Sequence, residues 1–183
     1  GVVTLSGTNV PSLWSAFGWS APAGCGYTNF YNFGMVRKFA GTLDLKDGSA
    51  FYNLASGTYE INGDGKLTYS GGCAGLFYNE GLLRKRSGTN SIFMPTLKNL
   101  GGTIQVDAGT LALNMYGDAY SEFNQGGGTL SFALGGRDAG EWGQITCTGG
   151  VTLGGALNVS LANGFAPAPG DEFRIIAGYW VRG

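Results

Sequence analysis

Two stretches of sequence decide the fold, and each repeats the other. FYNFGMVRKFAGTLDL at residues 30–45 aligns without a gap with FYNEGLLRKRSGTNSI at residues 77–92, which begins 47 residues later. The Phe-Tyr-Asn triplet that opens both also stands at residues 51–53, and weaker copies stand at 97–99 and 123–125. Successive copies are 20 to 26 residues apart, which indicates a repeat protein whose unit is a pair of unequal turns.

Short strands follow each triplet. Gly41-Thr42-Leu43-Asp44-Leu45 alternates apolar and polar residues, and the segments 57–61, 102–106, 109–113 and 128–132 do the same. This period of two is typical of a strand, and the glycines supply the backbone freedom that corners need. The sequence therefore predicts an all-β fold, a parallel β-helix (β-solenoid) with coils of about 20–26 residues.

Stacked coils give the triplet a physical meaning. Its first residue would point inward and form an apolar column of Phe30, Phe51, Phe77, Leu97 and Phe123. Its third residue would also point inward, where stacked amides form a structural ladder of Asn32, Asn53, Asn79 and Asn99. The tyrosine between them would point outward on successive coils.

Length and composition fit one solenoid domain over residues 1–183, with 1–29 as an irregular first coil or cap, 30–140 as the triplet repeats and 141–183 as terminal coils. Glycine is 35 of 183 residues. The sequence has no histidine, which excludes a Ser-His-Asp triad and a His-ligated zinc within this chain. The net charge of −1 disfavours bulk binding to nucleic acid, and no apolar run is long enough for a membrane-spanning helix. We predict no catalytic residues, no metal and no cofactor.

Outward tyrosines and basic residues are the candidate binding positions. Tyr31, Tyr52 and Tyr78 could offer rings for carbohydrate stacking, or they could form an aromatic ladder that only stabilises the coils. The triplet units also carry matching basic residues, which could form a patch for an anionic ligand or simply solvate the flank. These are Arg37, Lys38, Arg84, Lys85 and Arg86.

The three cysteines match no zinc-binding spacing. Cys25 and Cys73 each follow a glycine shortly before a triplet, and their separation of 48 residues places them on the same corner two coils apart. A disulfide between them requires the two loops to curl toward each other. Cys147 is expected in a strand as a buried apolar residue.

Three motifs carry a resemblance to a known group. They are F-x-N-x-G-x-L-x-K-x-x-G-T at 77–89, N-x-G-G-T-I-x-V-x-x-G-T-L-x-L at 99–113, and VTLGGALNVSLANGFAPAPGDEFRII at 151–176. Over residues 30–176 the chain resembles secreted bacterial surface proteins with autotransporter-type and planctomycete-type β-helix repeats. The resemblance implies a right-handed parallel β-helix, exported and often part of a very large chain. It transfers no catalytic residue.

The sequence thus favours a non-enzymatic extracellular or cell-surface protein, either a stiff structural or adhesive rod or a filament-forming subunit. Its expected partners are further copies stacked end to end or neighbouring domains of a longer chain, with cell-surface glycans as further candidates. The alternative is a carbohydrate-binding or polysaccharide-cleaving β-helix that uses the tyrosine column and the basic side. A surface-recognition module is a third hypothesis that the sequence does not separate from the first.

Overall fold

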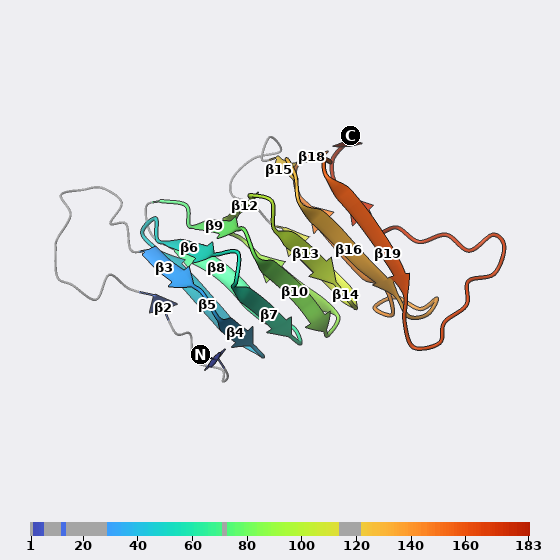
Figure 1. Ribbon diagram of the computed structural model, residues 1–183, viewed down its shortest axis with the longest axis horizontal. Coiled ribbons are helices and arrows are strands. Elements are labelled where there is room, and N and C mark those ends of the chain that lie inside the picture. The colour runs from blue at the N-terminus through green and yellow to red at the C-terminus, as the bar shows by residue number, and fades with distance from the viewer. Residues whose placement is uncertain (1, 6–11, 14–28, 71–72, 114–121) are drawn as a thin grey trace.

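The computed structural model shows an all-β parallel β-solenoid (Figure 1). It describes residues 2–5, 12–13, 29–70, 73–113 and 122–183, and these residues form strands and no helix. Each coil passes through three faces, and strands from successive coils pair in parallel on each face. The parallel β-helix predicted from the repeat is therefore confirmed.

Two faces are long continuous sheets of seven strands each. Sheet A contains, in spatial order, β1 (Val2–Leu5), β4 (Met35–Lys38), β7 (Thr58–Asn62), β10 (Leu82–Ser87), β13 (Thr103–Val106), β16 (Thr129–Leu134) and β19 (Ala156–Leu161). Sheet B contains β2 (Ser12–Leu13), β5 (Thr42–Lys46), β8 (Lys66–Ser70), β11 (Asn90–Phe93), β14 (Gly109–Leu113), β17 (Gly143–Cys147) and β20 (Ile176–Ala177).

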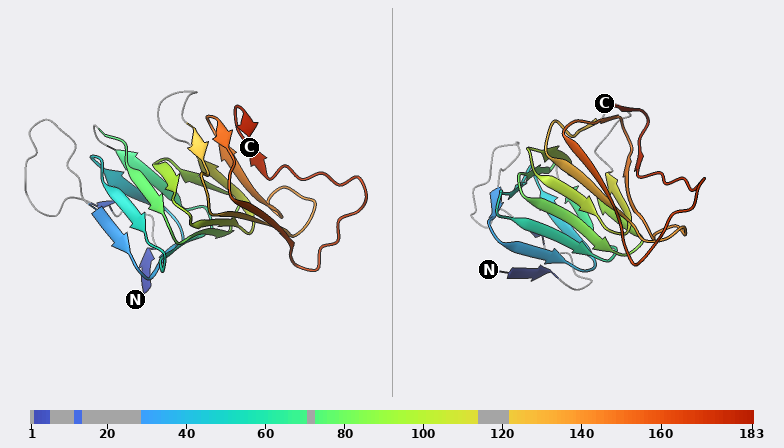
Figure 2. Two further views of the ribbon diagram at one scale, coloured as in Figure 1. Left: turned by 45° about the horizontal axis from the view of Figure 1, so that its top comes forward. Right: turned by 45° about the vertical axis from the view of Figure 1, so that its right-hand side comes forward.

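The third face is divided into two smaller sheets (Figure 2). Sheet C contains the triplet strands β3 (Asn29–Asn32), β6 (Ala50–Asn53), β9 (Leu76–Asn79) and β12 (Thr96–Asn99). Sheet D contains β15 (Phe123–Asn124), β18 (Val151–Thr152) and β21 (Val181–Arg182). The triplets are thus the strands of one face, which is why they are the most visible repeat in the sequence.

The strand register places like residues above like residues. In sheet C, Phe30 pairs with Phe51, Phe51 with Phe77, and Phe77 with Leu97. The rings of Phe51 and Phe77 stack at a centroid distance of 4.8 Å, and both side chains are buried. Phe123 of sheet D and Leu97 are also buried, so four of the five predicted members belong to the apolar core, and the partly buried Phe30 packs against it.

The predicted asparagine ladder runs along the edge of this core. The Asn32 amide donates to Asn53 Oδ1 at 2.8 Å, Asn53 donates to Asn79 at 2.8 Å, and Asn79 donates to Asn99 at 2.7 Å. Each of the first three amides also reaches a backbone carbonyl of the next coil: those of Thr58, Leu82 and Thr103. The ladder satisfies the polar groups of the corner and ties neighbouring coils together.

Glycines stack beside the ladder because the backbones approach closely there. A Cβ atom at Gly81 would overlap the carbonyl oxygens of Gly57 and Leu54, and one at Gly102 would overlap the Asn79 amide. This close approach explains why each triplet is followed by a glycine. A side chain does not fit at these glycine positions.

The coils near the C-terminus are longer than the predicted 20–26 residues. Phe123 pairs with Val151 and Val151 with Val181, separations of 28 and 30 residues. The extra length lies between strands of sheets A and B: one loop is closed by an antiparallel bridge between Leu134 and Trp142, and another spans residues 162–175. The triplet spacing alone did not predict these insertions.

Candidate functional site

The tyrosine column lies on the outer face of sheet C, as predicted. Tyr31 and Tyr52 stack at a centroid distance of 4.9 Å, and Tyr52 and Tyr78 at 4.7 Å. Burial raises the pKa of Tyr52, and the flanking Tyr78 and Tyr31 raise it further. Because the rings cover one another's faces, a ligand can reach their edges and hydroxyl groups and the outer face of Tyr31, which is 51% exposed. A sugar stacked flat on each ring does not fit this geometry.

The column continues with a different residue type. Lys98 of β12 pairs in register with Tyr78 and is exposed. An ammonium group thus stands at the next position of the same outer row as the three phenols. The row therefore combines aromatic edges, hydroxyl donors and one positive charge.

The three predicted arginines occupy the outer face of sheet A, where acidic residues neutralise them. Arg84 Nε donates to Asp107 Oδ2 at 2.6 Å. Glu60 lies between Arg37, at 3.4 Å, and Arg86, at 3.9 Å. The strand register gives the reason, because it places Glu60 directly beside both Arg37 and Arg84. The face is a cross-strand row of alternating charge.

The two lysines of the predicted basic patch are not on the surface. Lys38 is 2% exposed and Lys85 is 0% exposed. Lys85 Nζ donates to the carbonyls of Gly63 at 3.2 Å and Ser87 at 2.8 Å, and to Ser91 Oγ at 3.1 Å, while Lys38 Nζ donates to the Ala40 carbonyl.

Both lysines therefore bind corner backbone from inside the coil. Burial lowers the pKa of both, and for Lys85 the charge of Asp64 partly opposes that effect. The five basic residues do not form one surface. The reason is the alternation of side chains along β4 and β10, which sends arginine outward and lysine inward.

Asp64 has a structural role in a turn. Its carboxylate accepts hydrogen bonds from the backbone amides of Thr89 and Asn90 at 2.7 and 2.9 Å, and from Thr89 Oγ1 at 3.0 Å. Although partial burial acts to raise the pKa of Asp64, these hydrogen bonds and the charge of Lys85 outweigh it and lower the pKa. The side chain caps the turn of the next coil.

The cysteines are divided between a disulfide and a buried thiol. Cys73 is disulfide-bonded, whereas Cys25, its predicted partner, lies outside the described residues. Cys147 is free and buried in β17, and burial raises the pKa of its thiol. A buried thiol with a raised pKa is a packing residue rather than a nucleophile.

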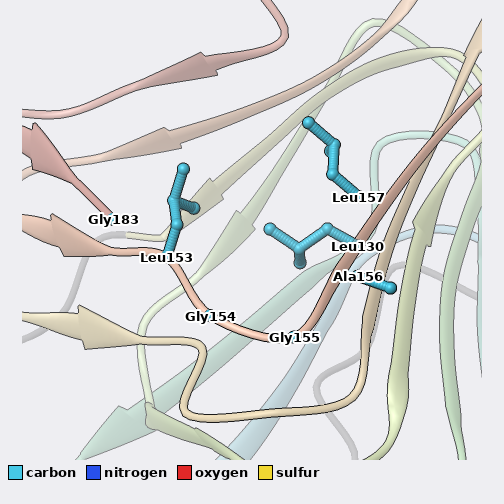
Figure 3. Close-up of a pocket in the computed structure, with 7 residues that line it drawn as sticks. All are labelled: Leu130, Leu153, Gly154, Gly155, Ala156, Leu157 and Gly183. Atoms are coloured by element: carbon cyan, nitrogen blue, oxygen red, sulfur yellow. The ribbon is translucent and has the colours of Figure 1, made fainter.

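A hollow opens at the C-terminal end of the solenoid (Figure 3). It has a volume of about 290 Å³. Leu130, Leu153 and Leu157 point into the region between the strands, and the backbone of Gly154 and Gly155 forms one wall. Its lining is mainly apolar, and it carries no titratable side chain. This hollow is the interior of the solenoid, opened where β19 forms the last strand of sheet A.

The described part of the chain contains no group of three or more acidic or cysteine side chains placed to hold a metal ion. Among the same residues, no helix has the length and apolarity needed to cross a membrane. Comparison with protein-family models, curated proteins and solved structures finds no match to this chain. The residues themselves must therefore carry any functional argument.

Sequence reasoning missed the acidic partners and the open end. Glu60 lies on the coil between the two matching units and Asp107 on the coil after the second one, so only the pairing of strands from different coils brings them beside the arginines. The sequence did contain a signal for the inward lysines. Lys38 is two residues beyond Val36 and Lys85 is two residues beyond Leu83, and residues two apart on a strand point to the same side. The inward position of Lys85 could have been found from that spacing.

Proposed function

We propose that this chain is a non-enzymatic structural or adhesive β-solenoid that acts outside the cell or at the cell surface as a stiff rod. The observation that carries the proposal is the continuity of the ladders across coils. Buried amides bond from Asn32 to Asn99, and Phe rings stack beside them. Such ladders link each coil to the next through side chains as well as backbone, which resists bending and extension.

The flank supports the same role. The outward arginines of sheet A are paired with Glu60 and Asp107, so the face is polar without a strong field of one sign. Paired charges keep a rod soluble and do not favour one charged ligand. The corner lysines and Asp64 are engaged with backbone, which adds to coil rigidity.

Single-molecule force measurement tests the rod proposal. The chain, held by handles at its two ends, should resist extension and then open in one cooperative event. An Asn79→Ala variant, which interrupts the amide ladder, should open at lower force, while Asn90→Ala, a substitution of an exposed asparagine, should not change the force. Coil-by-coil unravelling of the unsubstituted chain at low force would contradict a load-bearing role.

A second proposal is that the protein binds carbohydrate through the tyrosine row. Its support is the row of phenols that ends at Lys98, which could donate hydrogen bonds to sugar hydroxyls. Polysaccharide cleavage has less support, because Glu60 and Asp107 are paired with arginine. The test is a glycan array with the unsubstituted chain and with Tyr31, Tyr52 and Tyr78 all replaced by alanine. Equal retention by both chains would reject this site.

A further inference from the structure

The last strand of sheet A, β19, carries an apolar row like those of the earlier strands, but no further coil covers it. Leu157, Val159 and Leu161 of β19 are 53%, 49% and 58% exposed. Their register partners on β16, one coil back, have the same apolar character and are 2%, 0% and 7% exposed. The partners are Leu130, Phe132 and Leu134. One more coil on the outside would bury the β19 side chains in the same way.

The backbone at this end is also available. β19 pairs with β16 on one side, and no described strand pairs with its other side. A six-residue edge with an exposed apolar row is the type of strand edge that accepts another strand in parallel or antiparallel addition.

The long loop after β19 leaves this row uncovered. It extends past the end at the corner between sheets A and B (Figure 1). Arg137, from the loop of the preceding coil, holds it there: the guanidinium pairs with Asp171 at 2.7 Å and lies over the Phe165 ring at 5.2 Å. Phe173 packs edge-on against Trp142 at a centroid distance of 5.6 Å. These contacts anchor the loop to the flank.

We propose that the β19 end binds the β1 edge of a second copy of this chain, in register and in parallel. This inference rests on the proposed structural function and names its partner. The two edges belong to the same sheet, in which every pairing is parallel, so a copy translated along the solenoid axis presents β1 to β19.

The register columns identify the contacts at this joint. One column begins at Val3 and runs through Val36, Tyr59, Leu83, Ile104 and Leu130 to Leu157. The next begins at Leu5 and runs through Lys38, Ile61, Lys85, Val106 and Phe132 to Val159. Continuing both columns into a second copy places Val3 of that copy at Leu157 and Leu5 at Val159, apolar residue against apolar residue.

This joint is head to tail, so it does not close on itself. A translation repeated at each end produces an open filament rather than a dimer. The joint reuses the interface that already holds one coil on the next, including backbone hydrogen bonds and the continuation of both register columns.

The test compares two lysine variants of neighbouring β19 residues with the unsubstituted 183-residue chain. Leu157→Lys places a charge on the inward row, in a column that contains no lysine, and Asn158→Lys places the same charge on the outward face of the same strand. Sedimentation velocity over a concentration series, with electron microscopy, measures assembly. Circular dichroism and thermal unfolding check that both variants remain folded.

The unsubstituted chain and Asn158→Lys should form assemblies that lengthen with concentration. Leu157→Lys should raise the half-assembly concentration on the order of 100-fold, because the joint would bury a charge in a column that contains no lysine. A chain that stays monomeric at every concentration would overturn the joint while leaving the force measurement, and with it the rod proposal, standing. Equal assembly by Leu157→Lys, or equal loss in both variants, would also overturn it.

Cross-linking tests the register directly. Neighbouring strands are about 4.8 Å apart, within the range that a disulfide spans. A mixture of Leu5→Cys chains and Val159→Cys chains should form covalent dimers on mild oxidation, whereas Leu5→Cys with Asn158→Cys should not. Equal yields from both mixtures would overturn the in-register assignment.

Discussion

The amide ladder gives the sharpest prediction about stability. Asn79 is fully buried; it accepts a hydrogen bond from Asn53, and it donates to Asn99 Oδ1 at 2.7 Å and to the Thr103 carbonyl at 3.1 Å. Asn79→Ala removes all of these at once. It leaves Asn99 Oδ1 without its ladder donor and the Asn53 amide without its ladder acceptor, in a site closed to solvent.

The expected cost follows from those lost partners. Leaving one buried polar group unpaired costs about 1–3 kcal/mol, so two such groups and the vacated volume give about 3 kcal/mol or more. In a chain of this size that corresponds to a fall in Tm of roughly 6–12 °C. Asn79→Asp should be worse at neutral pH, because a carboxylate would face carbonyl oxygens. Protonation should recover part of the loss in acid, since burial raises the pKa of such a carboxyl.

Thermal and urea unfolding followed by circular dichroism measure the effect. The matched control is Asn90→Ala, which removes an exposed amide from β11 and should leave Tm within about 2 °C. A loss of less than about 1 kcal/mol for Asn79→Ala would refute the ladder as a main stabilising element. An equal loss of stability in Asn79→Ala and Asn90→Ala would show that the effect comes from the backbone preference of asparagine rather than from the amide ladder.

Three further predictions follow from the corners. Burial lowers the pKa of Lys85 from its ordinary 10.5, so the folded state gives up this proton more readily than the unfolded chain does. The free energy of unfolding of the unsubstituted chain, compared with that of Lys85→Met, should therefore rise as pH is raised toward 10.5, which urea midpoints measure. The pKa of Asp64 is lowered from 3.8, so its stabilisation should disappear as pH falls below that value, and Asp64→Ala should speed hydrogen exchange at the Thr89 amide. Gly81→Ala should fail to give a folded product in expression trials, whereas Gly127→Ala, whose Cβ meets no atom within 4 Å, should fold.

Much of the fold is predictable because residue identity repeats with the coil. The triplet at residues 30–32 and its copies fixed the Phe column, the amide ladder and the outward tyrosines, since one face repeats its residues almost unchanged. The longer terminal coils were not predictable, because loops that project from a solenoid leave its column pattern intact. The inward direction of Lys38 and Lys85, by contrast, was predictable, because side chains alternate along a strand and each lysine is two residues beyond a buried apolar residue.

The candidate sites were less predictable than the fold for a related reason. Arg84 is close in sequence to Arg86 but in space is paired with Asp107, which belongs to the next coil. A charge seen along the chain therefore says little about the surface until the register supplies its neighbours from other coils. The tyrosine row shows the same effect, because stacking hides the ring faces that the sequence suggested for binding.

The same nearest-neighbour logic supports the proposal that the C-terminal end, rather than sheet A, binds a second copy of the chain. On the flank several polar groups find partners one coil away, as Glu60 does with Arg37 and Asp64 does with the turn at Thr89. A residue in β19 has a neighbour on one side only, so Val159 keeps the exposure that Phe132 loses. In a fold built by adding coils, the interior and the sides are satisfied together, and the strand edges without a partner remain at the ends, which is where we propose that a second copy binds.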